Sequence, residues 1–355
     1  MPSSIASAGT SGPRKGPVDQ LGRRLRDLRI SVTDRCNFRC PYCMPAEIYG
    51  DSYPFLAKPE LLTFEEIERL ARLFAEIGVE KLRITGGEPL LRHELPQLLK
   101  RLVAIDGIAD LALTTNGYLL ARQAEALAQA GLSRITVSLD SHDEEIFKQM
   151  SGRDFGPQRV LDGIDAAARA GMSPIKINCV VQRDVNDNTL VDLARFFRER
   201  GDIVRFIEFM DVGTLNGWDL SQVVTAAEIA ERIDREFPIE PIAPNYAGEV
   251  ATRYRYRDGG GEIGIIPSVS APFCASCTRA RLTIEGKLVT CLFAESGADL
   301  RTPLRSGKSD AELTEHIQSI WSARNDRYSE QRAALAASPN QRSSRSRIEM
   351  YQIGG

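Results

Sequence analysis

The chain has 355 residues, of which 43% are hydrophobic and 26% charged, a mixture typical of a folded globular protein. Its net charge of -3 excludes broad electrostatic binding of nucleic acid, which requires a basic face. No apolar run approaches the roughly 18 residues of a membrane span, so we expect a cytoplasmic protein that binds neither nucleic acid nor a membrane.

The start of the chain, from Met1 to Gly16, is rich in Ser, Gly and Ala and has no apolar segment of the kind found in signal peptides. We interpret residues 1–20 as a flexible leader. Without a secretory signal, the seven cysteines indicate a reducing compartment. There, closely spaced cysteines are metal ligands more often than disulfide partners.

From Leu28 to about Met210, short β-rich apolar runs alternate with amphipathic helical stretches, as in parallel βα units. We expect strands over residues 28–33, 81–85, 110–115, 134–139, 174–181 and 203–210. We expect helices over residues 64–77, 119–130, 157–170 and 189–200. Thr63 and Glu66 form a capping box in front of the first helix. Six such units predict a partial barrel or an open parallel sheet.

After Met210 this rhythm is lost, and we place a domain boundary between residues 215 and 216. The barrel would then span residues 21–215 and a C-terminal region residues 216–355. For this region we expect a helix over 226–236, a proline-rich stretch over 238–244, extended segments over 253–257 and 262–267, a hairpin over 280–292, and a helix over 310–324. The hairpin would turn at Glu285-Gly286, and a polar Ser/Arg tail follows the last helix.

Three cysteines, Cys36, Cys40 and Cys43, directly follow the first predicted strand with the spacing C-x3-C-x2-C. They therefore share one loop at the carboxyl end of a strand, where parallel α/β folds bind ligands. Three thiolates can hold three irons of a 4Fe-4S cluster and leave the fourth iron open to chelate a small molecule. A zinc knuckle is the alternative, although zinc prefers four ligands and no histidine lies nearby.

The surroundings of this loop resemble the radical S-adenosylmethionine (SAM) superfamily. Tyr42 stands directly before the last cysteine, as in the signature C-x3-C-x-(Tyr/Phe)-C of that superfamily. Gly86-Gly87-Glu88-Pro89 follows the second predicted strand and resembles the Gly-Gly-Glu-Pro motif, whose backbone contacts the SAM amino group. Bare backbone at Gly86 and Gly87 would let a ligand approach closely.

A second cysteine group consists of Cys274, Cys277 and Cys291. The predicted hairpin would return Cys291 to the side of the C-x2-C pair. A second 4Fe-4S cluster with an open iron is our interpretation. A structural zinc site with Cys179 as fourth ligand is the alternative, but we interpret Cys179 as a buried strand residue, the usual state of a free cysteine.

Charged and hydroxyl residues alternate with aliphatic residues in several predicted strands. Period two places them on the face opposite the aliphatic residues, which is the inner face if helices cover the other. The residues concerned are Arg29, Arg83, Lys176 and Arg205, with Thr114 and Ser138, and Arg279 and Arg281 follow the second cysteine pair. A basic interior in an acidic protein favours an anionic substrate such as a polyphosphate.

With both cysteine groups and these cations assembled, residues 21–355 resemble the GTP 3',8-cyclase family of molybdenum cofactor biosynthesis. The resemblance rests on segments 27–40, 83–89, 113–117, 205–210 and 273–281 and on the terminal Gly354-Gly355. It implies a partial (βα)6 TIM-like barrel whose mouth is closed by a C-terminal α+β region. It also implies conversion of GTP to (8S)-3',8-cyclo-7,8-dihydroguanosine 5'-triphosphate, through a 5'-deoxyadenosyl radical that takes the hydrogen from ribose C3'.

The same resemblance assigns roles to residues. It implies two 4Fe-4S clusters, held by the two cysteine groups, and a second cluster whose open iron anchors guanine. Catalytic roles fall to Cys36, Cys40, Cys43, Arg279 and Arg281. SAM contacts fall to Tyr42, Gly86, Gly87, Glu88, Ser138 and Met210. GTP contacts fall to Arg29, Arg83, Thr114, Lys176, Arg279 and Arg281, and the Gly354-Gly355 tail would reach the active site.

The partners that the family implies are GTP, a flavodoxin-type or other reductant, and cyclic pyranopterin monophosphate synthase as acceptor of the product, with the chain acting as a monomer or homodimer. One alternative is a radical SAM peptide maturase with an auxiliary cluster. Another is a non-catalytic iron-sulfur or zinc scaffold or electron carrier. Such a carrier would have no use for the Gly-Gly-Glu-Pro motif or the interior arginines.

Overall fold

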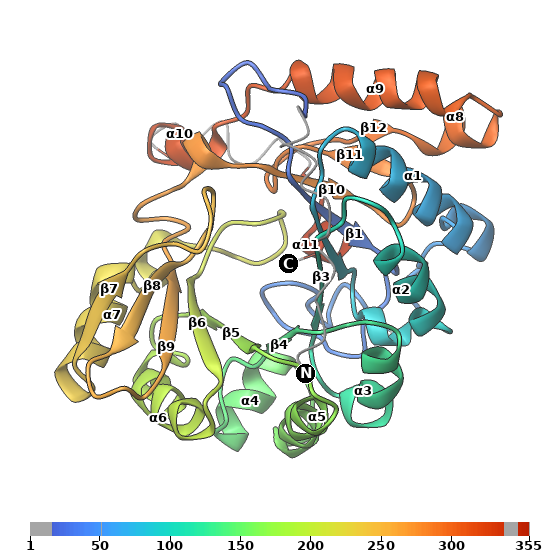
Figure 1. Cartoon of the computed structure of the whole chain (residues 1–355). Coiled ribbons are helices and arrows are strands. Elements are labelled where there is room, and N and C mark those ends of the chain that lie inside the picture. Colours follow the sequence, from blue (N-terminus) through green and yellow to red (C-terminus); the bar gives the residue numbers. More distant parts are fainter. Residues whose placement is uncertain (1–15, 51, 337–346, 355) are drawn as a thin grey trace, which may run out of the picture.

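The strands of the protein form one curved, open sheet with most of the helices on its outer face (Figure 1). The computed structural model describes residues 16–50, 52–336 and 347–354. Within these ranges the sheet has twelve strands in the order β12-β11-β10-β1-β2-β3-β4-β5-β6-β9-β8-β7. The predicted fold class, a partial TIM-like barrel, is confirmed.

The barrel half alternates strand and helix as the sequence pattern predicts. Its parallel strands are β1 (Asp27–Ser31), β2 (Lys81–Thr85), β3 (Asp110–Thr115), β4 (Ile135–Ser138), β5 (Ile175–Val181) and β6 (Ile203–Glu208). Its helices are α1 (Phe64–Glu76), α2 (Leu95–Val103), α3 (Leu120–Gln129), α4 (Glu144–Ser151), α5 (Gln158–Arg169) and α6 (Leu190–Arg200). All six expected strands and all four expected helices are present within a few residues of their predicted bounds, while α2 and α4 were not predicted.

Helix α1 shows how local sequence and burial agree. The Thr63 hydroxyl accepts a hydrogen bond from the backbone N–H of Glu66 at 3.2 Å, and the Glu66 carboxylate accepts one from the backbone N–H of Thr63 at 2.8 Å. This is the predicted capping box. Ile67, Leu70 and Phe74 recur at helical spacing and are fully buried in the hydrophobic core.

The C-terminal region continues the same sheet at both edges. Strand β9 (Glu262–Ile266) pairs parallel with β6, and β10 (Arg279–Leu282) pairs parallel with β1. Antiparallel strands extend these edges: β7 (Ile239–Ile242), β8 (Thr252–Tyr256), β11 (Lys287–Val289) and β12 (Ala298–Asp299). The helices are α7 (Ala226–Glu236), α8 (Arg301–Arg305), α9 (Asp310–Ser322), α10 (Tyr328–Ala336) and α11 (Met350–Ile353). The boundary between residues 215 and 216 stays a prediction.

Short 3-10 helices connect several of these elements. They are η1 (Lys58–Glu60), η2 (Pro89–Leu91), η3 (Asp187–Thr189), η4 (Leu220–Gln222) and η5 (Cys274–Ser276).

The predicted hairpin is present as β10 and β11, with Gly286 at φ +86° in its turn. The proline-rich stretch contains strand β7, which was not predicted. Pro241 is tolerated there because β7 lies at the edge of the sheet and pairs on one side only.

Of the expected leader, residues 1–15 lie outside the described residues. Asp19 is buried, and its carboxylate pairs with Arg23 at 2.6 Å and with Arg324 at 3.5 Å. The last residues of the expected leader therefore pack on the protein. Across the described ranges, no helix has both the length and the apolar character that crossing a membrane requires.

The strand register places the two cysteine groups at opposite ends of the barrel. Asp27, at the start of β1, pairs with Arg279, at the start of β10. Cys277 precedes this end of the strands, whereas the loop with Cys36 follows the other end of β1. The segment that carries the second cysteine group therefore lies at the end at which the strands begin. Helix α11 lies inside the curve of the sheet, against β1 (Figure 1).

Candidate functional site

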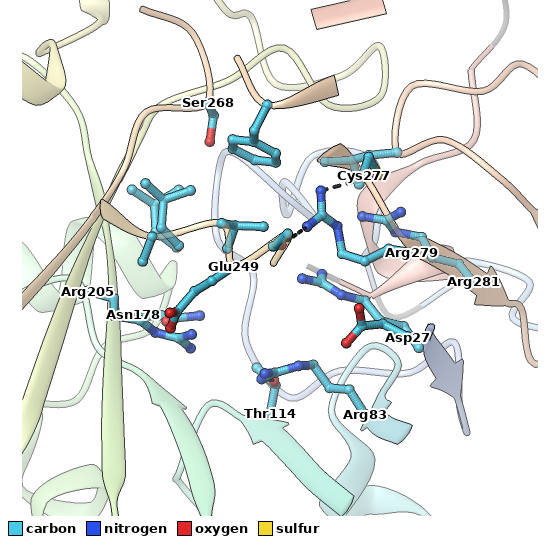
Figure 2. Close-up of a pocket in the computed structure, with 18 of the residues that line it drawn as sticks. Asp27, Arg83, Thr114, Asn178, Arg205, Glu249, Ser268, Cys277, Arg279 and Arg281 are labelled. Carbon is cyan, nitrogen blue, oxygen red and sulfur yellow. Dashed lines mark hydrogen bonds between the residues drawn. The ribbon is translucent and has the colours of Figure 1, made fainter. Parts of the chain in front are cut away.

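A cavity of about 440 Å3 lies inside the barrel, a volume within the usual range of small-molecule sites. The three thiols of the second cysteine group line it, together with Tyr42 and Met210 from the other end of the barrel. Between them lie the inward-facing residues of the strands (Figure 2). One chamber thus connects the neighbourhoods of the two cysteine groups.

The first cysteine group lies on the loop after β1, and its thiols are partly buried. The backbone N–H of Cys43 donates to the carbonyl of Cys40 at 2.9 Å, which closes a turn. The Cys36 sulfur accepts hydrogen bonds from the backbone N–H of Phe38 at 3.4 Å and from the Asn116 side chain at 3.7 Å. N–H groups directed at a sulfur favour the thiolate, which is the form that binds iron.

Burial raises the pKa of all three thiols of this group. The pKa of Cys36 rises to about 11, with the nearby Glu88 carboxylate as the next cause. Burial also raises the pKa values of Cys40 and Cys43, with the Asp140 carboxylate as the next cause for Cys40 and the Cys36 thiol as the next cause for Cys43. A metal that binds here must displace these protons, so we expect proton release on metal loading.

Gly86 and Gly87 pass directly over the cysteine loop. The backbone N–H of Gly87 donates to the carbonyl of Thr33 at 2.8 Å, and that of Glu88 donates to the carbonyl of Arg35 at 2.7 Å. A Cβ on Gly86 would lie 2.5 Å from the Thr33 oxygen, and one on Gly87 would lie 2.3 Å from the Arg35 oxygen. Close approach of two backbone segments therefore explains both glycines, and their contact with SAM stays a prediction.

The buried Glu88 side chain connects the Gly-Gly segment to the end of β3 through hydrogen bonds. Its carboxylate accepts hydrogen bonds from the Thr115 hydroxyl at 2.6 Å, the Asn116 backbone at 2.7 Å and the Leu90 backbone at 3.0 Å. Burial nevertheless raises its pKa to about 7. Among the described residues that line the cavity, Gly86, Gly87 and Glu88 are not found.

Tyr42, Ser138 and Met210, the other predicted SAM contacts, all line the cavity. The Tyr42 hydroxyl donates to the Asp140 carboxylate at 2.6 Å, and the backbone N–H of Val180 donates to the same carboxylate at 2.8 Å. Burial raises the pKa of Asp140 to about 6. Asp140 lines the cavity and was missed by the sequence analysis, because it follows β4 in a loop without periodic pattern.

The second cysteine group is assembled by the hairpin as predicted. Arg281 pairs with Val289 in the antiparallel ladder, and Cys291 follows two residues after Val289. This register brings Cys291 back beside the start of β10, where Cys277 lies. Cys274, Cys277 and Cys291 line the cavity together.

Two arginines shape the electrostatics at Cys277. The Arg279 side chain donates to the Cys277 sulfur at 3.3 Å, and the Arg324 side chain donates to the Cys277 carbonyl at 2.9 Å. Burial alone would raise the pKa of Cys277, but the two guanidinium groups outweigh it and lower the pKa to about 6. Cys277 is thus ready to bind iron as a thiolate near neutral pH.

The structure contradicts the zinc alternative that used Cys179 as a fourth ligand. Cys179 is fully buried in β5, and its sulfur contacts the Asp140 carbonyl at 3.3 Å, away from the second cysteine group. In the described part of the chain, no three His, Cys, Asp or Glu side chains converge as ligands of a single metal ion. One zinc ion requires such a common centre, whereas the thiolates of a 4Fe-4S cluster bind different irons. Cys179 therefore does not complete a zinc site with the second cysteine group.

All six predicted GTP contacts line the cavity, and Figure 2 shows four of them, Arg83, Thr114, Arg279 and Arg281. The six residues are Arg29, Arg83, Thr114, Lys176, Arg279 and Arg281. The Arg83 guanidinium donates to the hydroxyls of Thr114 at 3.1 Å and Thr136 at 3.2 Å, and Arg205 donates to Thr136 at 3.2 Å. None of the cations among them forms an ion pair with a described carboxylate.

These cations disfavour one another's charge. Burial lowers the pKa of Arg29 well below its ordinary value, and four neighbouring arginines lower it further. Burial followed by the charge of Arg205 lowers the pKa of Lys176 to about 8. The Nε atoms of Arg205 and Arg281 are buried without a hydrogen-bond partner among the described residues. Buried, unpaired cations of this kind favour binding of a polyanion.

The described part of the C-terminal tail reaches this chamber. Gly354 is buried at φ +69°, and a Cβ on it would lie 2.1 Å from the Thr85 side chain. The Arg29 guanidinium lies 3.5 Å from the Gly354 carbonyl. Gly355 lies outside the described residues.

The structure adds cavity residues that the sequence analysis did not select. Lys81 and Arg134 line the cavity, and both pair with Asp110. The period-two pattern that selects Arg83 in β2 and Ser138 in β4 also predicts inward-facing residues at positions 81 and 134. Tyr246 and Glu249 come from the loop between β7 and β8, where no periodic pattern marks them. Figure 2 shows Glu249 directed at Arg205 and Asn178.

Comparison with known proteins identifies two family models along the chain. Residues 30–197 match the radical SAM superfamily, and residues 202–330 match the family "Molybdenum Cofactor Synthesis C". The two matches meet between residues 197 and 202, ahead of the predicted boundary between residues 215 and 216.

Curated relatives cover nearly the whole chain. A GTP 3',8-cyclase of Acidothermus cellulolyticus is 56% identical over 319 residues, which are 89% of this chain and 88% of the relative. A GTP 3',8-cyclase of Staphylococcus haemolyticus is 51% identical over 338 residues, 95% of this chain and 98% of the relative. Among solved structures, Streptococcus suis SuiB bound to S-adenosylmethionine matches with a TM-score of 0.58 at 16% identity, over 84% of this chain and 65% of SuiB. The likeness to SuiB shows the fold.

Proposed function

The chain belongs to the GTP 3',8-cyclase family of radical SAM enzymes, and we propose that its barrel holds GTP between two iron-sulfur clusters and cyclises it to (8S)-3',8-cyclo-7,8-dihydroguanosine 5'-triphosphate. This reaction is an early step of molybdenum cofactor biosynthesis. The observation that supports the assignment most is the row of buried, unpaired cations between two groups of three cysteines. A triphosphate would supply these cations with the anionic partner that none of them has among the described carboxylates.

We assign the first cluster to Cys36, Cys40 and Cys43. These three thiolates would hold a cluster that, once reduced, would supply the electron for cleavage of SAM to methionine and the 5'-deoxyadenosyl radical, the species that would take the hydrogen from C3' of GTP. Tyr42, Ser138 and Met210 would contact SAM, because they line the cavity at the same end. Gly86 and Gly87 would hold the cysteine loop in place through the backbone contacts that exclude any side chain there.

We assign the second cluster to Cys274, Cys277 and Cys291, with its open iron as the anchor of guanine. Arg29, Arg83, Lys176, Arg279 and Arg281 would neutralise the phosphates and orient the ribose, and Thr114 would offer a hydroxyl. Their charges already face the cavity without carboxylate partners, so little rearrangement is needed on binding. Enclosure of the chamber would keep water away from the radical.

The likeness to SuiB concerns the fold alone and does not favour the peptide maturase alternative. A scaffold or electron carrier is excluded by the enzymatic family. We further propose that the enzyme acts in the cytoplasm as a monomer or homodimer. A flavodoxin-type reductant would supply electrons, and cyclic pyranopterin monophosphate synthase would take up the product.

The test is an anaerobic incubation of the iron-loaded protein with SAM, a reductant and each nucleoside triphosphate in turn. We expect 5'-deoxyadenosine together with an isomer of GTP, both separated by chromatography and identified by mass spectrometry. No comparable product should appear from ATP, CTP or UTP. Cyclisation of another nucleotide in preference to GTP would contradict the substrate assignment.

A further inference from the structure

Asp211 directly follows Met210 and gathers charged side chains from distant parts of the chain. Its carboxylate accepts hydrogen bonds from Arg332 Nε at 2.8 Å and from the Tyr328 hydroxyl at 2.5 Å. Arg347 donates to the Asp211 carbonyl at 2.9 Å and to its carboxylate at 3.3 Å. We call these four residues the Asp211 cluster.

The Asp211 cluster is largely shielded from solvent and internally connected. The side chains of Asp211 and Arg332 are 14% and 6% exposed. Arg347 also donates to the Tyr328 hydroxyl at 2.6 Å, and its guanidinium lies 4.5 Å from the centre of the Tyr328 ring. One carboxylate thus faces two arginines, so its removal would leave two cations close together with no described anion between them.

The cluster also contacts the end of the chamber that holds the second cysteine group. Phe293, two residues after Cys291, packs on Tyr328 with ring centres 4.6 Å apart and lies under the Arg332 guanidinium at 5.1 Å. Arg332 donates to the carbonyl of Ser268 at 2.9 Å, and Ser268 lines the cavity.

On its other side, the cluster leads into the C-terminal tail. Two residues after Arg347, the Glu349 carboxylate accepts hydrogen bonds from the Thr214 backbone at 3.0 Å and the Thr214 hydroxyl at 2.7 Å. A Cβ on Gly213 would lie 2.0 Å from a Glu349 oxygen, so this carboxylate lies directly against the Gly213 backbone. The tail is therefore fastened to the segment after β6 at two points, Asp211 and Thr214.

Beyond this fastening, the tail continues into α11, whose Met350 lines the chamber. Ile353 is fully buried, and the Tyr351 hydroxyl lies 3.0 Å from that of Tyr53. Gly354 then packs on Thr85, the residue before the Gly-Gly motif, and approaches Arg29. The same short segment after β6 thus carries Met210 into the cavity and holds the tail.

We propose that Asp211 is a positioning residue, which binds Arg347 and thereby holds residues 347–354 in the chamber, where Gly354 meets Thr85 and Arg29. The role in turnover rests on the proposed cyclase function. The role in holding the tail rests on the contacts alone. Loss of the carboxylate would release the tail without removing any ligand of a cluster.

The experiment compares Asp211→Asn, Asp211→Ala and Arg347→Ala with the wild type, all iron-loaded and handled without air. The matched control is Asp310→Asn, since Asp310 also accepts from an arginine, Arg69 Nε at 2.7 Å, but lies on α9 with a side chain that is 53% exposed. Amide hydrogen exchange reports on residues 347–354, with α1 as internal reference. Turnover, the KM for SAM, iron content and the thermal midpoint are measured on the same samples.

For the Asp211 and Arg347 variants we expect tail amides to exchange on the order of tenfold faster or more, and turnover to fall by a similar factor, because small misplacements near reacting groups are costly. The KM for SAM, iron content and exchange in α1 should stay at wild-type levels. A purely structural role would instead lower the thermal midpoint and raise exchange throughout.

Unchanged tail exchange in both Asp211→Ala and Arg347→Ala would overturn the proposal. Faster tail exchange with full turnover would overturn it as well. If Asp211→Ala does not fold, Arg347→Ala decides, because its side chain belongs to the tail itself. A wild type that fails to cyclise GTP would count against the proposed function, while the exchange data would still decide whether Asp211 holds the tail.

Discussion

At the scale of single residues, the interior cations lower the stability of the free protein and raise its affinity for an anionic ligand. Arg281 is 4% exposed, and burial followed by the charge of Arg279 lowers its pKa to about 10. A charge in this position destabilises the empty chamber and is compensated when a polyanion arrives. Substitutions here should therefore shift stability and affinity in opposite directions.

We predict that Arg281→Ala weakens GTP binding by about 30-fold or more, as expected for loss of a buried charge pair worth at least about 2 kcal/mol. The thermal midpoint of the free protein should stay the same or rise, because repulsion among the cations is relieved. Anaerobic calorimetry and thermal unfolding measure the two quantities. Arg235→Ala is the control, since Arg235 lies in an exposed ion pair with Glu231.

Arg281 is a cleaner test than Arg279, whose guanidinium also bonds the Cys277 sulfur. The iron content of the Arg281→Ala protein should equal that of the wild type. An equal loss of iron and of GTP binding would argue against a substrate contact and for a role in holding the second cluster.

Lys176 should make GTP binding depend on pH. Its pKa is lowered to about 8 in the free protein, and a bound triphosphate would raise it again. Below pH 8 the lysine is protonated in both states, so affinity stays constant. Above pH 8 the free protein loses the proton that the complex keeps, so affinity falls and binding takes up a proton.

Calorimetry at about pH 8.5 in buffers of different ionisation enthalpy counts this proton. Lys176→Arg should remove the pH dependence, because an arginine stays charged throughout this range. The same pH profile in the wild type and in Lys176→Arg would show that another group titrates.

The inner cations could be predicted from sequence because strands impose a period of two. In β5, Lys176 faces the cavity while Ile175 and Ile177 are buried on the other face. Tyr246 and Glu249 could not be predicted in this way, because a loop has no period that relates sequence position to direction. Asp211 also follows a strand and has no periodic pattern. Its partners Tyr328 and Arg332 lie more than 100 residues away along the chain, so no local pattern indicates the contact.

At the scale of elements, the contact between the Gly-Gly segment and the cysteine loop fixes the first site. Both segments follow neighbouring parallel strands, β1 and β2, and meet beyond their carboxyl ends. The backbones approach so closely that a single methyl group cannot be placed at Gly87 without moving the Arg35 carbonyl. A change there should therefore act on the whole loop.

We predict that Gly87→Ala loses the first cluster and keeps the second, so that the iron content falls to about half. SAM binding should be lost with it. Iron analysis and calorimetry with SAM check both statements. Gly50→Ala is the control, because a Cβ at Gly50 would meet only an ordinary contact at 3.6 Å. Full iron content and SAM affinity in Gly87→Ala would contradict the role of this contact.

Most elements could be predicted because the amphipathic period and the capping residues indicated the same helix or strand, as they do for α1. Helix α4 carried comparable signals, since the Asp143 side chain caps its start and Gly152 ends it at φ +62°. It was missed because it is only eight residues long. Strand β7 was missed because proline argues against strands, and only its place at the sheet edge makes Pro241 acceptable.

At the scale of the whole molecule, the register of β1 and β10 determines that the two cysteine groups face each other along the barrel. Local sequence patterns place the first group at the carboxyl end of a strand, but they do not show which end of the sheet the second group occupies. That information lies in a pairing between residues about 250 positions apart, such as Asp27 with Arg279. The resemblance to a family implied the overall fold and two clusters on either side of one chamber, and the structure adds the strand pairing that holds the two cysteine groups at opposite ends.

The same pairing leads to a prediction about the two halves of the chain. Strands β1 and β6 each pair on one side with a strand of the barrel half and on the other side with a strand from beyond residue 215. A fragment of residues 16–215 would expose both edges and the apolar surface that the C-terminal region covers. We expect this fragment to aggregate and to lack a cooperative thermal transition.

The full chain should unfold in one transition, because the strands before and after residue 215 are hydrogen-bonded into one continuous sheet. Light scattering and calorimetry of the fragment and the full chain make the comparison. A fragment that stays monomeric, unfolds cooperatively and binds the first cluster would show two independent domains joined at residue 215. One transition for the full chain and none for the fragment would mean that the C-terminal strands are part of the barrel, so that neither cluster site forms without them.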